Sequence, residues 1–182
     1  MQELQVNLFF VGIKHSGKTT FAKRISSRLS LPSFDTDDLI LLSLNGESVR
    51  EFYKREGKEA FIKKEVEAVS SFISSHHTSP FILSLGGGAA DNDALMAILH
   101  ENGKIVYLKR NEKDMLDVIL KHGVPAFLDK DDPARSFSIL YERRNAIYEK
   151  QADLTIDLGP YGDKKATEDY IWSFLKEKNY VR

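Results

Sequence analysis

Short apolar segments alternate with helix-like apolar stripes along the whole chain. The short segments predict five strands, at residues 7–11, 33–35, 81–85, 104–108 and 154–157. The first segment holds four consecutive apolar side chains, Leu8 to Val11, which is typical of a strand buried on both faces. Strands that alternate with helices predict an α/β fold with a mainly parallel sheet.

Helical patterns fill the intervals between these segments. They are expected at residues 19–29, briefly after Asp37, from Ser48 onward, at 57–75 and at 164–176, with further helices between the later strands. Ser48 and Glu51 have the spacing of a capping box, which indicates a helix start. Residues 122–133 contain two prolines, a glycine and clustered charges, so we expect a loop there and consider it a candidate lid.

Composition narrows the class of protein. The chain has 182 residues, 26 Lys+Arg against 27 Asp+Glu, 42% hydrophobic residues and no cysteine. This excludes a disulfide scaffold and argues against disorder and against the broad basic face of a nucleic-acid binder. No apolar run reaches the roughly 20 residues that span a bilayer, and the first residues lack a signal-peptide pattern. We therefore expect one cytoplasmic domain over residues 1–182, with neither membrane nor nucleic acid as a partner.

A phosphate-binding motif follows the first strand. Residues 12–19, G-I-K-H-S-G-K-T, match G-x-x-x-x-G-K-[ST] between an apolar strand and a helix, the context that this motif requires. Its glycines permit a tight loop whose backbone N–H groups surround a phosphate at the helix N-terminus. Lys18 would then reach the β- and γ-phosphates, and Thr19 would offer its hydroxyl to Mg²⁺. We expect His15 to face solvent, because such loops contribute mainly their backbone.

Carboxylates cluster at the end of the second predicted strand, in the sequence Asp35-Thr36-Asp37-Asp38. Ligands of open α/β sheets gather at the carboxyl ends of the strands, and phosphoryl transfer uses carboxylates near the metal and the acceptor hydroxyl. If the segment is extended, Asp35 and Asp37 share one side and Asp38 faces away. These aspartates could equally serve to start the next helix, so both interpretations stay open.

Three consecutive glycines, Gly86 to Gly88, follow the strand at 81–85. Such a run lowers the stability of regular structure, because glycine loses much conformational entropy on folding. It is expected where a ligand approaches the backbone closely or where the chain leaves a sheet sharply. Both explanations stay open.

Together these residues resemble the shikimate kinases, small P-loop kinases of the nucleoside-monophosphate-kinase type. The resemblance rests on motifs that run in family order and cover nearly the whole chain: the loop at 12–19, Phe34-Asp35-Thr36-Asp37, Gly57 through Phe61 to Glu65, Leu85-Gly86-Gly87-Gly88, and Arg143-Arg144 to Tyr148. It implies a three-layer α/β/α fold with a five-stranded parallel sheet in the order 2-3-1-4-5. It further implies acceptor-binding helices at about 37–75 and a mobile lid at about 120–134.

The resemblance also implies ATP and Mg²⁺ as cofactors, a small-molecule acceptor, and a monomer or weak dimer. The residues expected to bind the nucleotide are Gly12, His15, Ser16, Gly17, Lys18, Thr19 and Thr20. Thr19 and Asp35 would hold the metal. The residues expected at the acceptor are Asp37, Gly86, Gly87, Gly88 and Arg144, and those implied in catalysis are Lys18, Asp37 and Arg144.

Two departures from the family pattern concern charge. The family segment F-R-R-x-E reads Phe61-Ile62-Lys63-Lys64-Glu65, so its first arginine, which binds the shikimate carboxylate, is Ile62. The lid segment R-P-L-L is matched by Pro125-Ala126-Phe127-Leu128, so a second arginine is missing. An alkyl group cannot replace a guanidinium that binds a carboxylate with two hydrogen bonds. The cations considered as replacements are Arg55, Lys63, Lys64, Lys121 and Lys130.

Three functions fit these observations. The first is a shikimate kinase of aromatic amino-acid biosynthesis, which phosphorylates a ring hydroxyl with ATP. The second keeps the nucleotide chemistry and takes another small hydroxylated acceptor. The third is a nucleotide-binding protein without catalysis.

Overall fold

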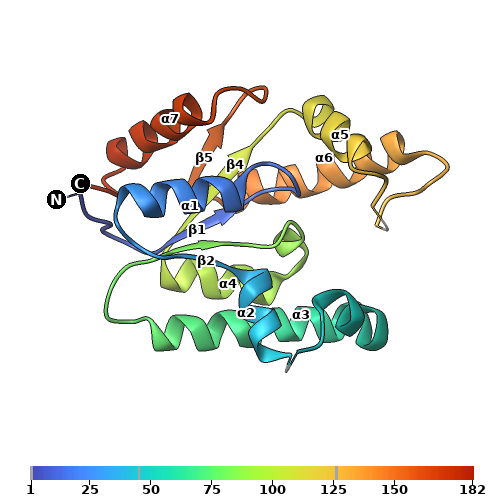
Figure 1. Ribbon diagram of the computed structural model, residues 1–182, viewed down its shortest axis with the longest axis horizontal. Coiled ribbons are helices and arrows are strands. Elements are labelled where there is room, and N and C mark those ends of the chain that lie inside the picture. The colour runs from blue at the N-terminus through green and yellow to red at the C-terminus, as the bar shows by residue number, and fades with distance from the viewer. Residues whose placement is uncertain (1, 45, 126) are drawn as a thin grey trace.

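Five strands form one parallel sheet in the order β2-β3-β1-β4-β5, as the resemblance implies (Figure 1). In the computed structural model, which describes residues 2–44, 46–125 and 127–182, their bounds are β1 (Leu8–Val11), β2 (Ser33–Asp35), β3 (Ile82–Ser84), β4 (Lys104–Lys109) and β5 (Leu154–Asp157). In the central register, Phe9 of β1 lies opposite Leu83 of β3 and Ile105 of β4. β1 is therefore a central strand, and its uninterrupted apolar sequence is explained by the apolar cores on both faces of the sheet.

Helices connect the strands and cover the sheet. They are α1 (Lys18–Arg28), α2 (Thr36–Ser43), α3 (Val49–Ser75), α4 (Asp93–Asn102), α5 (Glu112–Lys121), α6 (Pro133–Gln151) and α7 (Lys164–Glu177), with one 3-10 turn, η1 (Ala89–Asp91). The segment between α5 and α6 contains no helix or strand among its described residues, in agreement with the predicted loop. Ala126, which the resemblance assigns to the lid motif, lies outside the described residues.

The side chains of β1 alternate between two apolar cores. Leu8 and Phe10 pack in a core with α1 and α7, whereas Phe9 and Val11 pack in a core with α3, α4, α5 and α6. Figure 1 shows the resulting three layers, with α1 and α7 on one side of the sheet and α3 and α4 on the other. The three-layer arrangement follows from the strand period, because successive residues of a strand point to opposite faces.

Gly57 divides α3 into two helical segments. Its φ of 81° and ψ of −176° are not helical, and the φ lies in a region that side-chain-bearing residues rarely adopt. The first segment starts at the predicted capping box, in which the Ser48 hydroxyl accepts from the Glu51 N–H. The break confirms the predicted division into one helix from Ser48 onward and another over residues 57–75.

In the part of the chain that the structure describes, no helix combines the length and apolarity needed to span a membrane.

An ion-pair cluster joins α1 to α7 at the surface of their shared core. Glu168 is only 6% exposed, and its carboxylate accepts from Arg24 Nε at 2.8 Å and lies 3.3 Å from Lys165 Nζ. Asp169 pairs with Arg28 at 2.6 Å, but its side chain is half exposed. The two ion pairs have similar distances and differ mainly in how far the carboxylate is buried.

Glu168→Gln is expected to lower the free energy of unfolding by about 1–2 kcal/mol, because it leaves Arg24 with a weaker neutral partner in a largely buried position. Asp169→Asn is the matched control and should change it clearly less than Glu168→Gln does, since exposed pairs contribute little. Urea unfolding of the three proteins measures both values. Equal effects of the two substitutions would contradict the assignment of stability to the buried pair.

Candidate active site

The phosphate-binding loop connects β1 to α1 at the carboxyl edge of the sheet. Gly12 and Gly17 have φ values of 152° and 106°, which favour glycine. A Cβ atom on Gly12 would also lie 2.8 Å from the carbonyl oxygen of Leu108 in β4. Both glycines of the motif are therefore favoured by the backbone path, and Gly12 is also required by close packing against the neighbouring strand.

The loop carries polar groups that suit an anion. Ser16 Oγ is buried and has no hydrogen-bond partner among the described residues. Lys18 is 7% exposed, and its Nζ donates to the carbonyl of Ile13 at 3.0 Å. Burial lowers the pKa of Lys18 to about 8, although Asp35 and Asp37 act in the opposite direction. A phosphate would supply both the missing partner of Ser16 and the negative charge that Lys18 lacks, so the loop fits a nucleotide.

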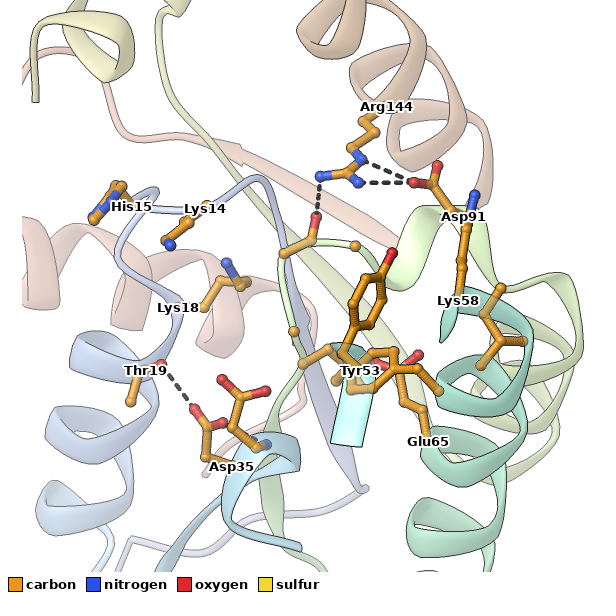
Figure 2. Close-up of a pocket in the computed structure, with 17 residues that line it drawn as sticks. Lys14, His15, Lys18, Thr19, Asp35, Tyr53, Lys58, Glu65, Asp91 and Arg144 are labelled. Atoms are coloured by element: carbon orange, nitrogen blue, oxygen red, sulfur yellow. Dashed lines mark hydrogen bonds and ion pairs between the residues drawn. The ribbon is translucent and has the colours of Figure 1, made fainter. Parts of the chain in front are cut away.

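Asp35 links the loop to the next helix through its two carboxylate oxygens. Oδ2 accepts from the Thr19 hydroxyl at 2.8 Å (Figure 2). Oδ1 accepts from the backbone N–H of Asp37 at 3.0 Å. The hydroxyl and the carboxylate form a pair of oxygen ligands suited to Mg²⁺. Asp35 is also the N-cap of α2, so capping and metal binding are not alternatives for this residue.

Asp37 lines the same cavity, but it lies on a helix and not on the extended segment that was expected. It belongs to the first turn of α2, which starts at Thr36, so the extended segment assumed for Asp35 and Asp37 is wrong. The helix begins earlier because Asp35 supplies the cap. The cavity partly removes the Asp37 carboxylate from water, and Asp35 lies beside it, so both factors raise the pKa of Asp37. A carboxylate with a raised pKa is suited to accept a proton.

The glycine turn is packed against the phosphate loop. A Cβ atom on Gly87 would lie 2.9 Å from the backbone nitrogen of Lys14, whereas one on Gly86 would lie 3.4 Å from Glu65 Oε1. Gly88 faces Arg144, whose Nη2 would be 3.5 Å from such an atom. Gly87 is thus explained by contact between two loops of the protein, while all three glycines also line the cavity.

Arg144 projects from α6 and is held in place by two acceptors. Its Nη2 lies 2.7 Å from Asp91 Oδ2, and its Nη1 donates to the carbonyl of Gly87 at 3.0 Å (Figure 2). Arg143 pairs with the same aspartate at 3.0 Å. Asp91, which the sequence analysis did not single out, therefore positions the arginine implied at the acceptor.

These groups surround one cavity of about 380 Å³. The residues that line it come from the phosphate loop and the start of α1 (Lys14, His15, Lys18, Thr19), from β2 and α2 (Asp35, Asp37), from α3 (Tyr53, Lys58, Phe61, Ile62, Glu65) and from the β3–α4 segment and α6 (Leu85, Gly86, Gly87, Gly88, Asp91, Arg144). A smaller hollow of about 260 Å³, which shares His15, Lys18 and Thr19 with this cavity, is lined by His15, Gly17, Lys18, Thr19 and Thr20. Residues expected at the nucleotide and at the acceptor therefore meet in one place.

The basic residues considered as replacements do not line this cavity. Arg55 instead pairs with Glu47 at 2.7 Å and with Glu56. The described cavity lining contains Lys14 and Lys58, which sequence reasoning missed. Spacing did contain a signal for Lys58, because it lies four residues before Ile62 and seven before Glu65, positions that share one face of a helix.

Glu65 is a buried carboxylate at the floor of the cavity. It is 4% exposed and accepts from Asn92 Nδ2 at 2.9 Å. Burial raises its pKa, with a further contribution from Asp37, while the bond from Asn92 acts in the opposite direction. Within the described residues no cation pairs with Glu65. Glu65 entered the sequence analysis only as the last residue of a family segment, and the structure places it in the cavity lining.

Side chains at the entrance connect the phosphate loop with the lid segment and with the loop after β5. The imidazoles of His15 and His122 are stacked with centroids 5.6 Å apart, and Lys14 Nζ lies 5.7 Å from the centroid of the Phe127 ring. His15 is partly exposed and also stacks on His122, so the expectation that it faces solvent describes only part of its surroundings. Tyr161 donates its hydroxyl hydrogen to the His15 carbonyl at 2.9 Å.

Arg110 supports the phosphate loop from the end of β4. Its Nε donates to the carbonyl of Ser16 at 3.0 Å, and its guanidinium lies 4.2 Å from the ring centroid of Tyr161. At 3% exposed it is a structural part of the loop, which the motif alone did not predict.

Comparison with known proteins agrees with this geometry. The sequence profile described as "Shikimate kinase" matches residues 14–173. The chain belongs to the shikimate kinase family. Shikimate kinases of Burkholderia thailandensis and Caldanaerobacter subterraneus subsp. tengcongensis are each 31% identical to it, over 85% and 94% of this chain and 82% and 98% of theirs. Members of this family are ATP-dependent kinases that use Mg²⁺.

Solved structures of shikimate kinases share the fold. The enzyme of Acinetobacter baumannii in complex with shikimate superposes with a TM-score of 0.80 at 23% identity, covering 96% of this chain and 93% of that chain. The enzyme of Bacteroides thetaiotaomicron has a TM-score of 0.77 at 22% identity, with coverage of 98% and 99%. At these identities the likeness establishes the shikimate kinase fold of the chain.

The affinity for MgATP is expected to fall as the pH rises through about 8, because the buried Lys18 then loses the proton that binding requires. Below that pH the ammonium is already formed and the affinity should be level. Titration calorimetry at about pH 8.5, in buffers of different ionisation enthalpy, should show proton uptake on binding. Lys18→Met should bind more weakly and take up no proton. Binding without proton uptake by the unaltered protein would contradict the assignment.

Proposed function

We propose that this protein is a shikimate kinase, which transfers the γ-phosphoryl group of ATP to a ring hydroxyl of shikimate in aromatic amino-acid biosynthesis. The observation that carries the proposal is that one cavity joins Lys18, Thr19 and Asp35 to Asp37 and Arg144. Relatives about 30% identical that are named shikimate kinase, and a structural neighbour described in complex with shikimate, support the same acceptor.

Each residue has a role that its surroundings suit. MgATP, when bound, supplies the phosphoryl group and a divalent cation that neutralises developing charge. Lys18 and the backbone N–H groups of the loop hold the phosphates, while Thr19 and Asp35 provide oxygen ligands for the metal. Asp37 orients the acceptor hydroxyl and takes its proton as the oxygen attacks phosphorus. Arg144, fixed by Asp91, binds the acceptor carboxylate.

A second candidate function is favoured by a specific observation on α3. Ile62 lines the cavity where the resemblance implies an arginine, and Phe61 and Tyr53 also line it, so these three positions offer no positive charge to a carboxylate. A less acidic small polyol would suit these positions better than shikimate. The nucleotide half of the site would be unchanged.

Steady-state release of ADP, measured with MgATP in the presence and absence of shikimate, distinguishes the two. We expect shikimate-dependent turnover that saturates below about 1 mM, a KM in the usual range for enzymes. A panel of uncharged polyols should be poorer substrates. Turnover with a polyol and none with shikimate would reject the proposal in favour of the second candidate.

Asp37→Asn should lower kcat by about 100-fold or more and leave the affinity for MgATP nearly unchanged, because the amide cannot accept the hydroxyl proton. In the unaltered protein, kcat/KM should fall with decreasing pH through the raised pKa of Asp37, above the usual range of aspartate. That acidic limb should disappear in the variant. Asp38→Asn, at an exposed neighbouring position, is the control and should retain activity. Full activity of Asp37→Asn would reject its role.

A further inference from the structure

Lys58 opens the second segment of α3, directly after the break at Gly57. The break ends one helical path and starts another, and Lys58, Ile62 and Glu65 then follow at helical spacing along the face that lines the cavity. Figure 2 shows the Lys58 side chain pointing toward Asp91, next to Arg144. The lysine is thus one helical turn from the position where the resemblance implies an arginine, on the same face.

The charges around Lys58 leave its ammonium available. Among the described residues it has no ion pair within 4.0 Å and no side-chain hydrogen bond. Lys58 is close enough to Asp91 for its positive charge to contribute to lowering the pKa of that carboxyl group. Burial would raise the pKa of Asp91, but the bond from Arg144 and the positive charges of both arginines and Lys58 outweigh burial and lower it. Asp91 is already bonded to two guanidinium groups.

Arg144 alone offers an incomplete site for an acidic acceptor. Three of its N–H groups already serve Asp91 and the Gly87 carbonyl, which leaves two for a ligand. The acceptor half of the cavity also contains the carboxylates of Asp37 and Glu65, which oppose the entry of an anion. A second cation on this side would offset that repulsion.

We propose that Lys58 binds the carboxylate of the acceptor together with Arg144, and so replaces, one turn earlier on α3, the arginine that Ile62 lacks. This inference rests on the proposed function and adds a specificity-determining residue to it. It also explains how an acidic acceptor could be retained beside an apolar residue at position 62.

Other cations are worse placed for this role. Lys14 lies on the phosphate loop and directs its ammonium toward Phe127 of the lid segment, on the nucleotide side. Arg55 is bound to Glu47 and Glu56. Lys63 is exposed and does not line the cavity, which makes it a suitable control on the same helix.

The test measures steady-state kinetics with shikimate and with its methyl ester, which lacks the negative charge. Lys58→Met should raise the KM for shikimate by about tenfold or more, the usual effect of losing one charge-assisted hydrogen bond. The KM for MgATP and the kcat should stay within about twofold. For the ester, Lys58→Met should change the KM little, because the partner charge is already absent.

Two further variants complete the design. Lys63→Met should leave all parameters within about twofold. Ile62→Arg in the Lys58→Met background should recover most of the lost affinity for shikimate, because it returns a cation to the same face.

The outcomes separate this inference from the proposed function. No turnover of shikimate by the unaltered protein would overturn both. Normal turnover with an unchanged KM in Lys58→Met would overturn the role of Lys58 alone. An equal rise in KM for shikimate and for the ester would do the same, since it would show that the lysine acts on the structure of the cavity and not on the carboxylate.

Discussion

One carboxylate holds the two halves of the site in register. Asp35 ends β2, accepts the Thr19 hydroxyl hydrogen through one oxygen and caps α2 through the other. The first contact fixes the start of α1 relative to the sheet, and the second fixes the helix turn that carries Asp37. The positions of Lys18 and Asp37 therefore depend on the same side chain, which places the proposed proton acceptor near the lysine of the phosphate-binding motif.

Several ionisable side chains that line the cavity are only partly paired with groups of opposite charge. Burial lowers the pKa of Lys18 and raises those of Asp37 and Glu65, which means that in each case the ionised form is held at a cost. Such a cost is acceptable where a ligand supplies the missing partner. By contrast, Asp91 forms ion pairs with two arginines, and its pKa is lowered. The unpaired groups face the cavity, and the paired group stabilises the wall.

Local pattern predicted much of this arrangement. Alternation of strands and helices, the glycine-lysine motif and the Ser48–Glu51 cap depend on neighbouring residues, so the sequence contains them directly. The resemblance added the strand order. The sequence pattern could not show that Asp35 caps α2, because the identity of the cap depends on the exact residue at which the helix starts. Nor could it identify Asp91 or Arg110, whose partners lie 31 to 94 positions away along the chain. Helical spacing did place Lys58 on the same face as Ile62 and Glu65, but not beside Asp91.

The contact of Gly87 with the backbone of Lys14 has a consequence for exchanging parts between related proteins. The glycine turn belongs to the acceptor half and the loop to the nucleotide half, yet they touch with no room for a methyl group. Neither half is an independent module. A chimaera that takes its glycine turn from one parent and its phosphate loop from another would have to preserve this contact between the two backbones. A shift of either backbone would move the groups proposed to react away from one another.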